Sequence, residues 1–290
     1  MPKVHALGRT VLTTIIAPFA LSLSLAAQAL PASQPAPTEK PSSAQLVAQD
    51  IAGAGRLRMQ SQRLPKLYQQ VGMGINTAAV IQQITATIGE VDAEFGRLAR
   101  YSRKSGTQRI YGRSEVAWQE LRMVLKKAPT PPNGERVNQL ADELMNSTGK
   151  LAMLIEAEAE TPVGRLLDLS SRLNMLAQRL ARLYLQTHAG DKSQSVLTDI
   201  EQAQKEFAAG LKELDSAREN SPASREAIAL AKNQWIFFDM AVSQLNAKGR
   251  SDERATRNVV TSSERIAQML DDASLQYAKD YAEGLRSGRP

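Results

Sequence analysis

The stretch AGRLRMQSQRLPKLY, residues 54–68, decides how this sequence is interpreted, because SSRLNMLAQRLARLY at residues 170–184 repeats it. The two stretches align without gaps at a constant offset of 116 residues. Eight of the fourteen positions from Gly55 to Tyr68 are identical in the second stretch: Arg56, Leu57, Met59, Gln62, Arg63, Leu64, Leu67 and Tyr68. Chance similarity would not preserve this order, so the sequence predicts two copies of one structural unit.

The similarity continues beyond these stretches, and it predicts an all-α protein. Phe95 corresponds to Phe207 and Trp118 to Trp235, in the same order in each copy. Alanine, leucine, glutamine, arginine and glutamate dominate the composition, which favours helices. Short segments rich in Gly, Pro, Asn and Ser interrupt both copies at similar places. They leave four expected helices per copy: 44–71, 77–104, 108–128 and 135–160, then 162–188, 192–217, 222–247 and 252–284.

The short connections favour antiparallel neighbours, so we expect two tandem antiparallel four-helix bundles. The expected organisation has five parts along the chain. These are a signal peptide at 1–29, a Pro/Ser-rich linker at 30–43, the first bundle at 44–160, a second, degenerate copy at 161–284, and a tail at 285–290.

The first 29 residues have the pattern of an export signal. Lys3 and Arg9 precede an apolar run, and Ala27-Gln28-Ala29 is a small-residue cleavage pattern. The alternative is a retained membrane anchor, but the run is near the lower length limit for a span and contains Pro18. We therefore expect a periplasmic protein, and the absence of cysteine means that helix packing, not disulfide bonds, must stabilise it.

The net charge and the composition argue against two functional classes. The formal charge is +6, aromatic residues make up 4% of the chain, and no basic run is interleaved with aromatic residues, so we expect no nucleic-acid partner. Motifs for metallopeptidases, phosphate loops and nucleophile elbows are absent, and His188 near a helix end is more typical of capping than of catalysis. We expect no enzymatic activity and no cofactor.

The second stretch contains regularly spaced leucines that predict a buried seam. Arg165, Arg172 and Arg179 recur every seven residues along one flank of that seam. We interpret them as boundary arginines that pair with carboxylates of a neighbouring helix.

Arg58 in the first stretch differs from these boundary arginines, since it points about 200° round the helix from Arg56. Its helical neighbours include Gly55, Ser61 and Gln62, whose small or polar side chains would allow another helix to approach closely. A guanidinium beside hydroxyl and amide groups at a helix contact is a candidate anion site. Pro65 lies in the same helix, and we expect it to kink the helix there; the alternative is that the helix ends at this point.

The motif AGRLRMQSQRL at residues 54–64 resembles the signature helix of the PilJ/NarX-like periplasmic sensor domain. This family supplies the sensor part of type IV pilus chemoreceptors and of nitrate/nitrite sensor kinases. The degenerate second stretch also resembles it. In nitrate-sensing members the resemblance implies an anion held at a symmetric dimer interface by the arginine that precedes the methionine, which is Arg58 here.

The resemblance makes Arg58 the principal ligand-binding candidate, with Gly55, Ser61, Gln62 and Arg63 in the same motif. The second-copy counterparts are Asn174, Arg172 and Arg179. Asn174 can still form hydrogen bonds but lacks the charge of Arg58, so we expect no nitrate site in the second copy.

Two functions follow from these observations. The first is an exported sensor-type protein that binds a small anion such as nitrate or nitrite and relays the signal to a separate receptor. The alternative is a non-catalytic envelope scaffold or accessory protein of a type IV pilus or chemosensory system that binds only protein partners. A homodimer and a membrane receptor or other envelope protein are the candidate macromolecular partners.

Overall fold

The computed structural model describes residues 43–158, 162–248 and 253–286, and this part of the chain is helical apart from short turns. The all-α prediction is confirmed. The expected signal peptide at 1–29 lies outside the described residues, as do nearly all of the expected linker and most of the expected tail.

The first four helices begin and end close to their expected limits. They are α1 (Ser43–Gly72), α2 (Thr77–Leu98), α3 (Gln108–Val124) and α4 (Pro131–Glu156), with a 3₁₀ helix, η1 (Ala99–Arg103), after α2. The α4 helix begins four residues earlier than we expected, at Pro131, because proline is tolerated in the first helical turn, where its missing N–H is not needed. The α1 helix continues through Pro65, so the alternative in which it ends there is wrong.

The second four helices are α5 (Pro162–His188), α6 (Gln194–Ser216), α7 (Pro222–Lys248) and α8 (Glu253–Arg286). Helix α5 packs on α6 and α8, and α7 packs on α8, as α1 packs on α2 and α4, and α3 on α4. These contacts are consistent with two four-helix arrangements. The aromatic pairs correspond as well: Phe95 stacks on Trp118 at 6.5 Å between ring centroids, and Phe207 on Trp235 at 4.0 Å.

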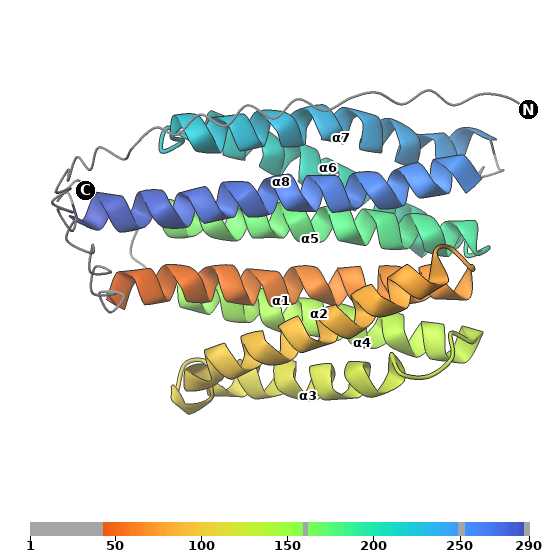
Figure 1. Cartoon of the computed structure of the whole chain (residues 1–290), viewed down its shortest axis with the longest axis horizontal. Coiled ribbons are helices and arrows are strands. Elements are labelled where there is room, and N and C mark those ends of the chain that lie inside the picture. The colour runs from red at the N-terminus through yellow and green to blue at the C-terminus, as the bar shows by residue number, and fades with distance from the viewer. Residues whose placement is uncertain (1–42, 159–161, 249–252, 287–290) are drawn as a thin grey trace, which may run out of the picture. The chain divides into compact units, whose positions relative to one another are not determined.

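The most extensive helix contact joins the two sets of helices through α1 and α5, which run side by side (Figure 1). These are the helices that carry the two related stretches. The contact places Leu57, Leu64, Leu173 and Leu180 in a continuous core, each at most 1% exposed. In the described part of the chain, no helix combines the length and apolar character that a bilayer span requires.

Candidate functional site

Helices α1 and α5 meet at Gly55 and Ser171, two positions that the 116-residue offset aligns with each other. A Cβ atom at Gly55 would lie 2.3 Å from Oγ of Ser171 and 2.5 Å from its Cβ. Only a glycine therefore allows this approach without moving the helices. The close approach that the small residues of the motif predicted is confirmed, and the contact lies between matching points of the two stretches.

The Arg58 side chain lies beside this contact and reaches across to α5. Its Nη2 atom donates hydrogen bonds to Oδ1 of Asp168 at 2.9 Å, to the Asp168 carbonyl at 3.0 Å and to Oγ of Ser171 at 3.3 Å. The Arg58 side chain is 8% exposed, and Gly149 of α4 leaves room for its stem, since a Cβ there would lie 3.3 Å from Cδ of Arg58. Burial lowers the pKa of Arg58, and Asp168 opposes this shift.

Asp168 was not foreseen, and it changes the character of the candidate anion site. Its carboxylate already supplies a negative partner for Arg58. The Nε atom of Arg58 is buried and has no hydrogen-bond partner. Any external anion must therefore compete with an internal carboxylate for one face of the guanidinium.

The other candidates of the first stretch point elsewhere, and only Gly55 lies with Arg58 at the contact. Ser61 donates to the Arg58 carbonyl within α1 at 2.6 Å. The Gln62 amide donates to Oδ1 of Asp142 at 3.3 Å. Arg63 pairs with Glu264 of α8 at 3.0 Å. These three side chains contribute to helix packing and are not gathered round Arg58.

The second-stretch counterparts also form contacts within α5–α8. The flank arginines form a ladder of ion pairs with α6 at seven-residue intervals: Arg165 with Glu213, Arg172 with Glu206, and Arg179 with Asp199. The expected boundary role of these arginines is confirmed. Asn174 donates to Oδ1 of Asp271 at 2.9 Å and to the Ala267 carbonyl at 3.2 Å.

Lys66 is a buried cation that the sequence interpretation missed. Its side chain has no exposed surface, and its Nζ atom donates to Oε1 of Gln178 at 2.5 Å, to Oγ of Ser263 at 3.1 Å and to Glu264. Burial lowers the pKa of Lys66, while Glu264 opposes the shift. Burial disfavours ionisation of Glu264, but the charges of Lys66 and Arg63 outweigh it and lower the pKa of Glu264 to about 2.

Arg182 occupies the position that corresponds to Lys66 and is buried in the same way. Its Nη2 atom donates to Oδ1 of Asp142 on α4 at 2.8 Å. The two cations thus reach from α1 to α8 and from α5 to α4. The sequence contained a signal for them, because a basic residue precedes Leu-Tyr in both stretches, at Lys66 and at Arg182.

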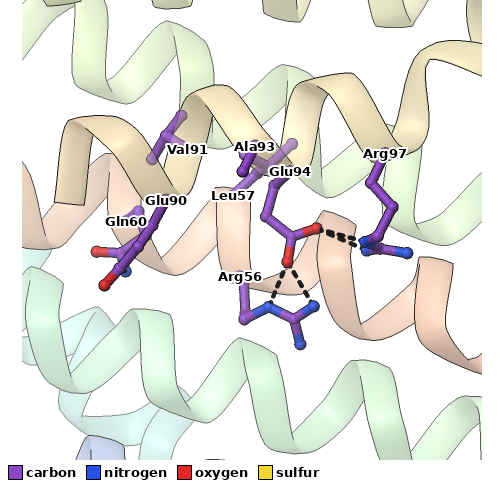
Figure 2. A pocket seen from close by; sticks show the side chains of 8 residues that line it. All are labelled: Arg56, Leu57, Gln60, Glu90, Val91, Ala93, Glu94 and Arg97. Carbon is purple, nitrogen blue, oxygen red and sulfur yellow. Dashed lines mark hydrogen bonds and ion pairs between the residues drawn. The ribbon is translucent and has the colours of Figure 1, made fainter. Parts of the chain in front are cut away.

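Two pockets flank α1 near its contact with α5. The first, of about 300 Å³, lies between α1 and α2. Figure 2 shows Glu94 between Arg56 and Arg97. Glu94 forms an ion pair with Arg56 at 2.5 Å and with Arg97 at 2.6 Å. The second, of about 490 Å³, lies between α1, α5 and α8, with Arg56 and Arg97 also in its lining. Within the described ranges, no group of three or more His, Cys, Asp or Glu residues is placed to hold a metal ion.

Comparison with known families finds a match in the first half of the chain. Residues 42–144 match the family described as the type IV pili methyl-accepting chemotaxis transducer N-terminal domain, PilJ. Residues 42–144 are a PilJ domain. No curated protein and no solved structure matches the chain. The PilJ match includes Gly55 and Arg58 and ends within α4, so Asp168 and Asn174 lie in the part of the chain that it does not cover.

Proposed function

We propose that this chain is a non-catalytic sensor-type helical module that acts in the periplasm and relays to a separate receptor. In this proposal α5–α8 is a second, diverged copy of the PilJ-type unit. The observation that carries it is the contact of α1 with α5 at the aligned positions Gly55 and Ser171. One chain then forms internally the helix pair that the resemblance implies for two protomers.

Within this function, we propose that a small anion acts at the Arg58–Asp168 ion pair. Nitrate and nitrite are the leading candidates for this anion. An anion that takes the guanidinium from Asp168 breaks a bond between α1 and α5, and the freed carboxylate can turn toward solvent because its side chain is 21% exposed. The contact between the two helices would loosen, and a receptor docked on them could detect the change.

Titration with nitrate by calorimetry tests this proposal on the natural chain and three variants. Arg58→Gln should abolish binding. Asp168→Asn should tighten it about tenfold or more relative to the natural chain, because a charged hydrogen-bonding competitor is removed. Arg113→Gln, which removes an exposed arginine of α3 that pairs with Glu143, is the matched control and should bind as the natural chain does.

Two results would contradict the anion proposal. One is equal nitrate binding by the natural chain and Arg58→Gln. The other is an Asp168→Asn protein that is folded and still binds neither nitrate nor nitrite. Either result would leave the sensor-type helical module without an anion site at Arg58.

The alternative, a scaffold that binds only protein partners, is favoured by an apolar surface on α7. Ile236, Phe237 and Met240 are between 56% and 68% exposed. The aligned positions of α3 carry Gln119 and Glu120 in place of Ile236 and Phe237, so the helical fold does not itself require apolar residues there. If a receptor binds this surface, crosslinking to the receptor should be lost in Phe237→Glu and should not change when nitrate is added. Met123→Glu, which changes an exposed residue of α3, should retain the crosslink.

A further inference from the structure

The pocket between α1, α5 and α8 has the size of a small-molecule site. Its volume is about 490 Å³, within the range of ligand pockets. The apolar part of the wall comes mainly from Ala52 and Met59 of α1 and from Leu275 and Ala278 of α8. Asn174 of α5 and Asp271 of α8 provide polar groups on the same wall. We call this space the α1–α8 pocket.

Asp271 is a partly buried carboxylate without an ion pair among the described residues. It accepts a hydrogen bond of 2.9 Å from the Asn174 amide. By contrast, Asp50 pairs with Arg97 and Arg100, and Glu264 pairs with Arg63 and Lys66. Burial raises the pKa of Asp271 to about 6, although the Asn174 hydrogen bond and Arg56 oppose this shift. A carboxylate in this position is stabilised by any cation brought to it.

The orientation of the Asn174 amide is determined by its partners. The side chain is buried, and its Nδ2 atom donates to the Ala267 carbonyl and to the Asp271 carboxylate. Both partners accept hydrogen bonds, so the amide nitrogen must face them and Oδ1 must face away. Oδ1 is buried without a donor and has no surface open to the pocket, so the carboxylate of Asp271 is the acceptor that a ligand can reach.

The arginines at the pocket do not make it an anion site. Arg56 pairs with Glu94, and Arg97 pairs with Glu94 and Asp50. Their charges are therefore compensated by carboxylates outside the pocket lining, whereas Asp271 accepts only the hydrogen bond from the neutral Asn174 amide.

We propose that the α1–α8 pocket binds a small primary amine, whose ammonium group donates hydrogen bonds to the Asp271 carboxylate. The carbon chain of the amine lies against Met59, Leu275 and Ala278. A primary ammonium suits the site because it brings both a positive charge and N–H donors to the carboxylate, whereas a quaternary ammonium has the charge but no donor. This site uses neither Arg58 nor Asp168, so it goes beyond the anion proposal.

Thermal-shift and calorimetric titration with n-butylamine, ethanolamine and 1,4-diaminobutane at pH 7.5 tests the proposal. At least one of these amines should bind the natural chain, while tetramethylammonium and n-butanol should not. Asp271→Asn should weaken amine binding about tenfold to a hundredfold, since a charged hydrogen-bond partner is lost. Glu253→Gln, which changes an exposed carboxylate of α8 outside the pocket lining, is the matched control and should bind as the natural chain does.

The pH dependence provides a second measurement. The charged groups near Asp271 are Arg56 and Arg63 of α1, Arg97 of α2 and Asp272 of α8, and none of these has an ordinary pKa between 5 and 8. Amine binding should weaken as the pH falls through about 6, where Asp271 takes up a proton. This dependence should be absent in Asp271→Asn.

The proposal is overturned if none of the three amines binds the natural chain, or if Asp271→Asn binds them with unchanged affinity. Arg58→Gln separates this outcome from the anion proposal, because it should leave amine binding intact, and Asp271→Asn should leave nitrate binding intact. If the natural chain binds only nitrate or only amines, the result therefore shows which of the two sites is absent.

Discussion

Replacing Glu264 by glutamine is expected to lower the free energy of unfolding by about 3 kcal/mol, because it leaves the fully buried ammonium of Lys66 without a counter-charge. The expected value is at the lower end for a broken buried pair, since the Glu264 side chain retains 34% exposure and water can partly replace it. Lys66 keeps neutral oxygen partners in Gln178 and Ser263, but these do not compensate its charge. Urea unfolding followed by circular dichroism measures the change.

Two comparisons isolate the buried charge as the cause. The double variant Lys66→Met/Glu264→Gln should recover most of the lost stability, because an apolar side chain of similar length then fills the buried position. Glu213→Gln, which removes the partner of Arg165 in an exposed pair, should change stability by less than about 1 kcal/mol. Equal losses in Glu264→Gln and Glu213→Gln would contradict the buried-charge explanation.

Acid should act on the same pair. The pKa of Glu264 is about 2 in the folded chain, below its ordinary value of 4.5. Its ionised form therefore stabilises the fold at every pH above about 4.5, and this contribution is lost as the pH falls from about 4.5 to 2. Unfolding midpoints measured between pH 7 and 2 should show a smaller acid dependence in Glu264→Gln than in the natural chain.

Gly55→Ala is expected to lower the free energy of unfolding by about 2 kcal/mol, although alanine is the better helix former. The added Cβ would lie 2.5 Å from Cβ of Ser171, so α1 and α5 must move apart at the centre of their contact. That movement would also stretch the hydrogen bond from Arg58 to Asp168. Denaturant unfolding of the purified variant measures this effect.

The chain offers a matched control for this substitution. Gly89 lies in α2 with open space where its Cβ would be, so Gly89→Ala should raise stability by about 0.5–1 kcal/mol. The double variant Gly55→Ala/Ser171→Gly places the side chain on the opposite helix and should recover at least half of the loss. A Gly55→Ala protein as stable as the natural chain would show that α1 and α5 do not approach so closely.

The helices could be predicted from the sequence because their signals are local. Apolar spacing and the Gly-, Pro- and Asn-rich segments between helices identified all eight expected helices of the described chain. The errors lie at helix ends, where the same residues can either belong to the helix or lie outside it. Pro131 and Pro132 were expected to precede α4 but form its first turn, and residues 99–103 continue α2 as a 3₁₀ helix instead of an α-helix.

The candidate site was predicted only in part, because its partners lie far apart in sequence. The close approach at Gly55 followed from small residues on one helical face, but nothing near Arg58 indicated that Asp168, 110 residues away, would pair with it. Lys66 and Glu264 are 198 residues apart. Side-chain periodicity places a residue on a face of a helix, whereas helix packing decides which charge it meets there.

The pairing of α1 with α5 inside one polypeptide has a consequence for how such a contact can diversify. In a complex of two identical chains, every substitution at the symmetry axis occurs twice, so an arginine there must face another arginine. Here Gly55 meets Ser171 and Arg58 meets Asp168, and each side can change alone. The contact is also unimolecular, so dilution of the protein does not dissociate it. The charges of Arg58 and Asp168 cancel each other, so this pair can form before any ligand binds.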